Sequence, residues 1–170
     1  PTRRGDAGTR SLNFALQAAL NPPKPGKQER RFGELIFREG DRVMQTRNDY
    51  DVVWQKEDGT AGTGIFNGDV GKIAKIDPSG ELLEIVFDDR TATYTSDMLA
   101  ELDMAYAMTV HKAQGSEYQC VVLAAMPAAP SLMVRGVLYT ALTRARELLI
   151  VVGDDAAIRA MAANDRQQRR

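Results

Sequence analysis

The spacing of hydrophobic residues changes twice along the chain and divides it into three stretches. In residues 11–20 the hydrophobic positions recur at helical spacing, with Ser11 as a candidate N-cap and Asn21-Pro22-Pro23 as a stop. The face predicted to be buried comprises Leu12, Ala15, Leu16, Ala19 and Leu20. Residues 22–31, which are rich in proline and charge, are expected to form an exposed connection.

The second stretch begins at Gly40, where short runs of strand-forming residues replace the helical spacing. The predicted strands are residues 42–46, 51–54, 70–76, 82–87 and 91–95. Turn signals separate them, and these are Asp58-Gly59, Asn67-Gly68 and Pro78-Ser79-Gly80. Short strands this close together favour a small antiparallel barrel.

The third stretch follows Met104 and alternates strand and helix. Residues 118–125 and 148–152 are nearly continuous hydrophobic runs, as expected for strands covered on both faces. Residues 131–146 between them are predicted to be a helix, so the two strands should be parallel. Asp154 is a candidate cap for a last helix.

These three stretches predict an α/β fold with a parallel sheet, interrupted by a small β-barrel. We expect residues 1–66 and 103–170 to form the α/β domain and residues 67–102 to form the inserted barrel. A barrel of that size buries little core on its own, so it would need to rest on a neighbour.

Composition narrows the classes of protein that fit this chain. The net charge is −1 and the sequence pI is about 5.9, which speaks against binding nucleic acid by overall positive charge, so any DNA contact must be local. No hydrophobic run approaches the ~20 residues that cross a bilayer, and we expect a cytoplasmic protein without a membrane partner. Cys120 lies in a hydrophobic run and is expected to be a packed thiol. Because the chain opens without an initiator Met, we expect an excised fragment.

Two polar segments flank the predicted strand-helix-strand unit. The first is Thr109-Val110-His111-Lys112-Ala113-Gln114-Gly115-Ser116-Glu117. Its hydroxyl, imidazole and ammonium groups can donate to phosphate oxygens, and Gly115 would let a ligand approach the backbone closely. A solvated loop explains the same composition. His111 has no Cys, Asp or Glu at ligand spacing, so no metal site is expected.

The second polar segment is Tyr139-Thr140-Ala141-Leu142-Thr143-Arg144-Ala145-Arg146, at the end of the predicted helix. Arginine near a helix C-terminus has an ordinary explanation in the helix dipole. Two guanidinium groups at the edge of a sheet could also receive the phosphate of a nucleotide, because phosphoryl transfer requires stabilisation of negative charge.

The glycine-rich stretches do not form a phosphate-binding loop. Gly59-Thr60-Ala61-Gly62-Thr63-Gly64 lacks the closing Lys-Ser/Thr pair, and Gly71-Lys72 is followed by Ile73. The chain alone is therefore not expected to hydrolyse ATP.

Taken together, the two polar segments resemble motifs V and VI of superfamily 1 DNA helicases in their RecD/TraA-like form, the family of the exodeoxyribonuclease V alpha subunit. The resemblance extends upstream to Gly5-Asp6-Ala7-Gly8, Leu12-Asn13, Leu16-Gln17, Leu20-Asn21-Pro22, Gly40-Asp41-Arg42-Val43-Met44-Gln45, Asn48-Asp49-Tyr50 and Phe66-Asn67-Gly68-Asp69-Val70-Gly71. It implies the second RecA-like motor domain of such a helicase, with an inserted SH3-like barrel.

The resemblance also implies roles for single residues. Arg144 would be the arginine finger that reaches the γ-phosphate of ATP, and Arg146 would assist it. The DNA-contacting positions would be Thr109, His111 and Lys112, and the positions coupling DNA to nucleotide would be Gln114, Gly115 and Glu117. ATP and Mg²⁺ would be held mainly by the first RecA-like domain, and the intact enzyme would unwind DNA from 5′ to 3′ along a single strand.

Other readings stay open at this point. The same half-motor could belong to a free-standing helicase, to a subunit of an exonuclease V-type complex, or to a conjugative relaxase. In a different class, the chain could be a non-catalytic module whose barrel recruits a protein or RNA, since small barrels often do so.

Overall fold

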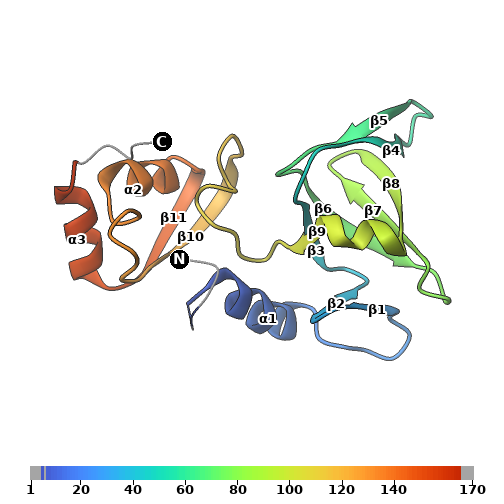
Figure 1. The fold of residues 1–170 in the computed structure, drawn as a ribbon, viewed down its shortest axis with the longest axis horizontal. Helices are drawn as coiled ribbons and strands as arrows, with labels where there is room; N and C mark the ends of the chain where they lie inside the picture. Colours follow the sequence, from blue (N-terminus) through green and yellow to red (C-terminus); the bar gives the residue numbers. More distant parts are fainter. Residues whose placement is uncertain (1–4, 6, 166–170) are drawn as a thin grey trace. The chain divides into compact units, whose positions relative to one another are not determined.

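A computed structural model describes residue 5 and residues 7–165, and the chain in it divides into two compact units (Figure 1). The larger unit is residues 13–107, which we call the barrel unit. The other combines the start of the chain, to Leu12, with residues from Met108 onward, and we call it the α/β unit. No helix among the described residues is long and hydrophobic enough to cross a bilayer.

The barrel unit is built on one antiparallel sheet of seven strands, in the order β5-β4-β8-β7-β6-β3-β9. The strands are β3 (Arg42–Gln45), β4 (Asp49–Gln55), β5 (Ala61–Ile65), β6 (Val70–Ile76), β7 (Leu82–Phe87), β8 (Arg90–Thr95) and β9 (Leu102–Met104). A 3₁₀ helix, η1 (Ser96–Glu101), joins β8 to β9. A separate hairpin of β1 (Glu29–Phe32) and β2 (Leu35–Arg38) precedes the sheet. All five predicted strands are confirmed as strands.

The sheet is wider than the predicted barrel of residues 67–102. Strands β3, β4 and β5 come from the part of the chain that we expected in the α/β domain. The reason lies in the core, because Val43 and Ile65 from these strands are fully buried and pack in the same cluster as Ile73 and Phe87. Strands from 67–102 alone would leave that hydrophobic face uncovered.

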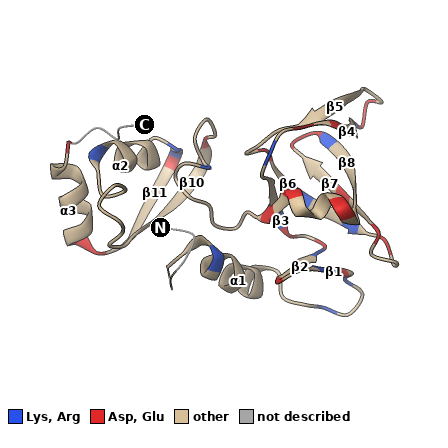
Figure 2. Cartoon of the chain, in the orientation of Figure 1, with Lys and Arg blue, Asp and Glu red and all other residues tan. Residues whose placement is uncertain are grey.

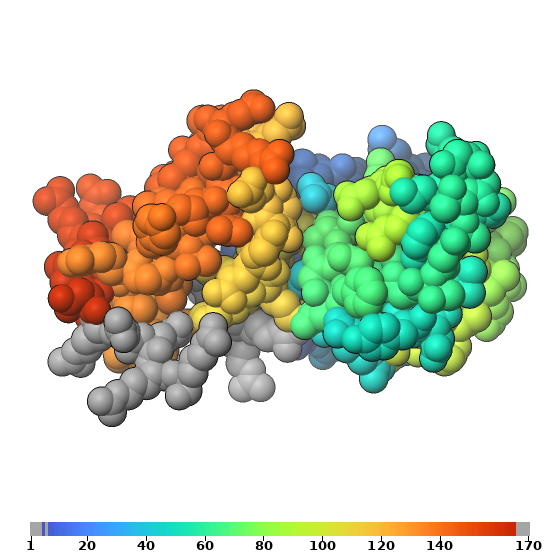
Figure 3. Space-filling view, turned by 90° about the horizontal axis from the view of Figure 1, so that it is seen from above, coloured from blue at the N-terminus to red at the C-terminus, as the bar shows by residue number. Residues whose placement is uncertain are grey.

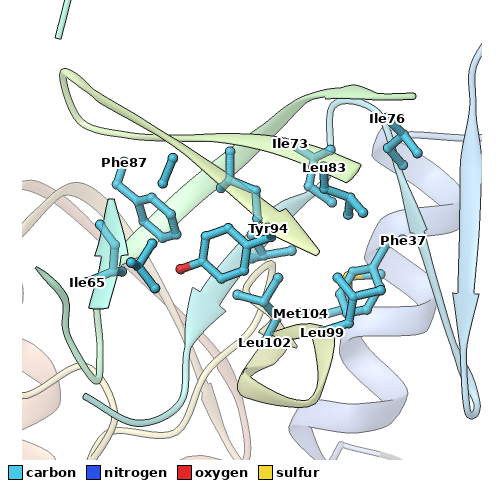
Figure 4. Packing of buried hydrophobic residues seen from close by; sticks show 14 residues of the cluster. Phe37, Ile65, Ile73, Ile76, Leu83, Phe87, Tyr94, Leu99, Leu102 and Met104 are labelled. Atoms are coloured by element: carbon cyan, nitrogen blue, oxygen red, sulfur yellow. The ribbon is translucent and has the colours of Figure 1, made fainter. Parts of the chain in front are cut away.

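Tyr94 lies at the centre of this core (Figure 4). Its side chain is fully buried, and its hydroxyl donates a 3.0 Å hydrogen bond to Oε1 of Gln45. Gln45 in turn donates from Nε2 to the carboxylate of Glu101, at 2.8 Å. Burial, together with neighbouring carboxylates, raises the pKa of Tyr94. Within the buried cluster of Figure 4, the hydroxyl of Tyr94 is therefore paired, as a buried polar group must be.

Helix α1 (Thr9–Leu20) buries its polar face instead of the predicted hydrophobic one. Asn13, Gln17 and Asn21, which recur every four residues, are buried, whereas Leu20 is 69% exposed. Asn13 donates to the backbone oxygens of Met104 and Ala107, at 3.1 and 2.9 Å. The predicted burial was wrong because these amides satisfy backbone groups that a hydrophobic face would leave unpaired. The helix also begins at Thr9, before the predicted cap.

The acceptor for much of this polar face is Asp41, which is fully buried. Its carboxylate accepts from Nε2 of Gln17 at 2.6 Å, from Nδ2 of Asn21 at 2.7 Å, from the backbone N–H of Arg38 at 2.7 Å and from the hydroxyl of Tyr106 at 2.8 Å. Burial, followed by this bond to Asp41, raises the pKa of Tyr106 to about 12. The carboxylate thus joins α1, β2 and the segment that follows β9.

The α/β unit contains two parallel strands, as predicted. These are β10 (Tyr118–Ala125) and β11 (Ala145–Gly153), paired from Tyr118 with Ala145 to Ala125 with Gly153. Helix α2 (Arg135–Leu142) connects them and is shorter than the predicted 131–146, because Thr143 ends the helix and β11 begins two residues later. Helix α3 (Asp155–Ala163) starts at the predicted cap, with Asp154 accepting from the N–H of Ala156 at 2.8 Å.

The two strands of this sheet are not covered on both faces, contrary to the prediction. Among the described residues Val122 is 67% exposed and Val152 is 56% exposed, and Cys120 is exposed rather than packed. A sheet of two strands with α2 and α3 offers too little surface to bury both sets of side chains. A continuous hydrophobic run therefore predicted the strands correctly and their burial incorrectly.

Replacing Asp41 with alanine is expected to destabilise the barrel unit by at least about 3 kcal/mol, since three buried donors and the half-buried hydroxyl of Tyr106 lose their acceptor. Urea unfolding followed by the fluorescence of Trp54, the single tryptophan, measures this. Asp51→Ala, at an exposed position, is the control and should change stability by less than about 0.5 kcal/mol. Equal effects of the two substitutions would contradict the role given to Asp41.

Candidate functional site

Residues 109–117 form a compact series of turns before β10. The backbone N–H of Ala113 donates to the oxygen of Thr109 at 3.1 Å, and that of Ser116 donates to Ala113 at 3.2 Å. Ala113 is buried at the centre, whereas the side chains of His111 and Gln114 are exposed. Gly115 has a φ of +87°, a conformation that glycine adopts without strain. The turns thus hold polar side chains outward on a fixed backbone.

Arg144 links this loop to the end of α2. Its Nη1 donates to the backbone oxygen of Ser116 at 2.9 Å, its Nε donates to the oxygen of Thr140 at 3.1 Å, and its Nη2 donates to Oγ1 of Thr143 at 3.3 Å. The backbone oxygen of Arg144 also accepts from the N–H of Tyr118, at 2.8 Å. A guanidinium carries five N–H groups, so these bonds leave two of them for a ligand. The half-buried side chain is therefore oriented but not saturated.

Arg146 and Glu117 make a second link between the same two segments. Nε of Arg146 lies 2.7 Å from Oε2 of Glu117. Both side chains are well exposed, at 66% and 49%, so solvent screens the pair and it adds little stability. Arg146 lies on β11 and Arg144 precedes that strand, which corrects the expectation that both end a helix. The structure brings Glu117, Arg144 and Arg146 together at the start of the parallel strands.

His111 and Gln114 face a different part of α2. They border a groove of about 550 Å³ whose other polar walls are Arg135, Tyr139, Thr140 and Asp165. Thr109 and His111 also border a hollow of about 370 Å³ that is otherwise lined mainly by hydrophobic side chains of the α/β unit. The predicted DNA-contacting residues therefore lie on the 109–117 loop, whereas Arg144 follows the end of α2 and Arg146 lies on β11.

Sequence analysis assigned no role to Arg135 or Tyr139. Tyr139 is 67% exposed and stands four residues after Arg135, so both are on one side of α2. The sequence shows the spacing of Arg135 and Tyr139. That spacing places the two side chains on one side of a helix only when the limits of the helix are known.

The groove and the Arg144 region carry guanidinium, imidazole and amide groups, together with the carboxylates of Asp165 and Glu117. Within the described ranges, no three His, Cys, Asp or Glu side chains gather as they would around a metal ion. Guanidinium, imidazole and amide groups suit the phosphate oxygens of a nucleotide or of a nucleic-acid backbone.

Comparison with known families accounts for both units. Residues 12–87 match the SH3 domain of ATP-dependent RecD-like DNA helicases, and residues 104–152 match the UvrD-like helicase C-terminal domain. Over most of its length the chain is therefore similar to RecD-like DNA helicases. Except for its first residue, Leu12, the first match lies within the barrel unit. The second match contains the 109–117 loop, Arg144 and Arg146.

Curated relatives carry RecD names. The chain is 37% identical over 169 residues to the ATP-dependent RecD2 DNA helicase of Deinococcus radiodurans, which is 99% of this chain and 21% of that protein. It is 31% identical over 161 residues to the RecBCD enzyme subunit RecD of Mycolicibacterium smegmatis, covering 93% of this chain and 25% of the relative. The chain thus spans about a fifth to a quarter of the length of these RecD-like relatives.

Charge is divided unequally between the two units of this RecD-like chain, and Figure 2 marks the basic and acidic positions of the described residues. By sequence, the α/β unit has eleven Lys and Arg against six Asp and Glu, a net charge of +5. The barrel unit has eleven against seventeen, a net charge of −6. The near-neutral total therefore conceals a basic sequence in the α/β unit, and residues 1–6 and 166–170 contribute four of its five net positive charges.

If Arg144 holds the loop in place, Arg144→Ala should accelerate amide hydrogen exchange at Ser116 and Tyr118 in this chain, because both amides lie next to bonds that the substitution removes or loosens. Arg159→Ala, on the exposed side of α3, is a matched control that should leave both amides unchanged. Unaltered exchange in Arg144→Ala would show that the loop is ordered independently.

Proposed function

We propose that this chain is part of the second motor half of an ATP-dependent DNA helicase that moves 5′ to 3′ along a single strand. The α/β unit belongs to a RecA-like domain, and the barrel unit is its SH3-like insertion. The observation that carries the proposal is the joining of residues 116–117 to Arg144 and Arg146 at the start of two parallel strands. In this arrangement one loop can respond to both a nucleotide and a DNA strand.

Arg144 is the proposed arginine finger. The two N–H groups left after its bonds to Ser116, Thr140 and Thr143 point to a ligand with paired oxygens, and a phosphate fits such a fork. Across the cleft of the whole enzyme, the first RecA-like domain would hold ATP and Mg²⁺. Arg144 would stabilise the charge on the transferred phosphoryl group, and Arg146 would brace the loop through Glu117.

The DNA strand is proposed to contact Thr109, His111 and Lys112. His111 is exposed beside the groove, and the hydroxyl of Thr109, which accepts from the N–H of Lys112 at 3.3 Å, keeps its own proton for a phosphate. Between this end and Arg144 lie the proposed coupling residues Gln114, Gly115 and Glu117. Because the turns connect the two ends of the 109–117 loop, a shift at the DNA-contacting end would displace the end beside Arg144.

The division of charge supports contact with DNA through the α/β unit. Its net charge of +5 favours a phosphate backbone, whereas the net charge of −6 on the barrel unit opposes one. The barrel would steady the motor or a strand outside it by contacts other than bulk charge. Partnership with exonuclease V-type subunits is a further proposal, motivated by relatives named RecBCD enzyme subunit RecD.

In the full-length helicase, Arg144→Ala is expected to lower ATP turnover by about 10³-fold or more while single-stranded DNA binding is retained. A coupled assay of phosphate release with saturating oligonucleotide, beside a fluorescence-anisotropy titration, separates the two effects. Arg159→Ala serves as the control for a lost positive charge on the same unit. Turnover that stays at the wild-type rate in Arg144→Ala would reject the assignment.

The 170-residue chain on its own is expected to show no ATP turnover, because it carries the finger without a phosphate-binding loop. It should still bind single-stranded DNA weakly, with an affinity that falls steeply as salt rises. Robust turnover by the purified chain would refute this expectation.

A further inference from the structure

The groove between the 110–114 turns and α2 has the composition of a site for one nucleotide. Its volume of about 550 Å³ is that of an ordinary small-ligand site. One wall carries His111 and Gln114, the other carries Arg135, Tyr139 and Thr140, and Asp165 also lines the groove. Val137 contributes an apolar surface. Polar donors on two sides and an aromatic ring at the rim suit a ligand that is part base and part phosphate.

We propose that this groove binds one nucleotide of single-stranded DNA, with Tyr139 stacking on its base and Arg135 contacting its backbone phosphate. The inference rests on the proposed helicase function and extends the DNA contacts from the loop onto α2. Tyr139 and Arg135 would then form the second wall of a track whose first wall is His111.

The position of Arg135 favours this role. Its Nε donates to the backbone oxygen of Ala162 at 2.7 Å, and its backbone N–H donates to Asn164 at 2.7 Å. The stem is therefore fixed against the end of α3, while the side chain as a whole remains exposed. A guanidinium held in this way loses little freedom when it binds a phosphate.

Tyr139 is placed on a rigid element and is 67% exposed. A tyrosine ring has a face that can stack on any base, which suits a motor that must pass every sequence. An abasic strand distinguishes base stacking from a phosphate contact, because it cannot stack on Tyr139 but still offers its phosphates. Base stacking also distinguishes the proposal from a protein-docking role of the groove, for which the bases of DNA are irrelevant.

The experiment titrates this chain with a fluorescent thymidine decamer and with an abasic strand of the same length, at low salt. Tyr139→Leu should weaken binding of the thymidine strand roughly fivefold or more and change binding of the abasic strand little. Tyr139→Phe, which keeps the ring, should bind both strands as wild type does. Tyr50→Leu is the matched control, since Tyr50 is 66% exposed but lies on the barrel unit, and it should change neither affinity.

Arg135→Gln provides an independent arm. This substitution should weaken binding of the thymidine strand and of the abasic strand to the same extent. It should also reduce the slope of log affinity against log salt by about one. Circular dichroism establishes that each variant is folded before its affinity is interpreted.

An equal loss on both strands in Tyr139→Leu, or no loss on either, would overturn the stacking role while leaving the helicase proposal intact. Failure of the wild-type chain to bind either strand would overturn both, because the track itself would then be absent. Binding by wild type that is equal for the two strands would likewise exclude a base contact in the groove.

Discussion

The bond from the guanidinium of Arg144 to the backbone oxygen of Ser116 is the contact on which the site depends. It ties the end of the turn-rich loop to the end of α2, and the N–H of Tyr118 returns a bond to the oxygen of Arg144. The two parallel strands begin from this junction. Backbone oxygens of Ser116 and Thr140 orient the Arg144 guanidinium, which retains two N–H donors. Arg144 therefore serves both the local fold and the proposed contact with phosphate.

A second constraint lies in the barrel unit, where Asp41 gathers donors from α1, β2 and Tyr106. Tyr106 stands three residues before Thr109, so the chain leaves this buried carboxylate and enters the proposed DNA-contacting loop almost at once. Figure 3 shows the atoms of the chain coloured by sequence, with those of residues 96–125 in yellow-green to light orange.

Sequence alone predicted what depends on local spacing. The strands of the barrel, the parallel pair β10 and β11 and the cap at Asp154 follow from periodicity and turn chemistry. The candidate site segments were proposed from polar density and resemblance. Burial was predicted less well, since it depends on partners distant in sequence. The polar face of α1 was missed because the acceptor at Asp41 could not be known, and Cys120 was expected to be packed because its neighbours are hydrophobic.

The most direct test of the account is the structure of the full-length helicase bound to single-stranded DNA and ADP-aluminium fluoride. The account predicts that the guanidinium of Arg144 lies about 2.7–2.9 Å from fluoride or oxygen atoms in the position of the γ-phosphate. If instead another residue occupied that position, and Arg144 contacted only the backbone of its own domain, the central claim would be contradicted.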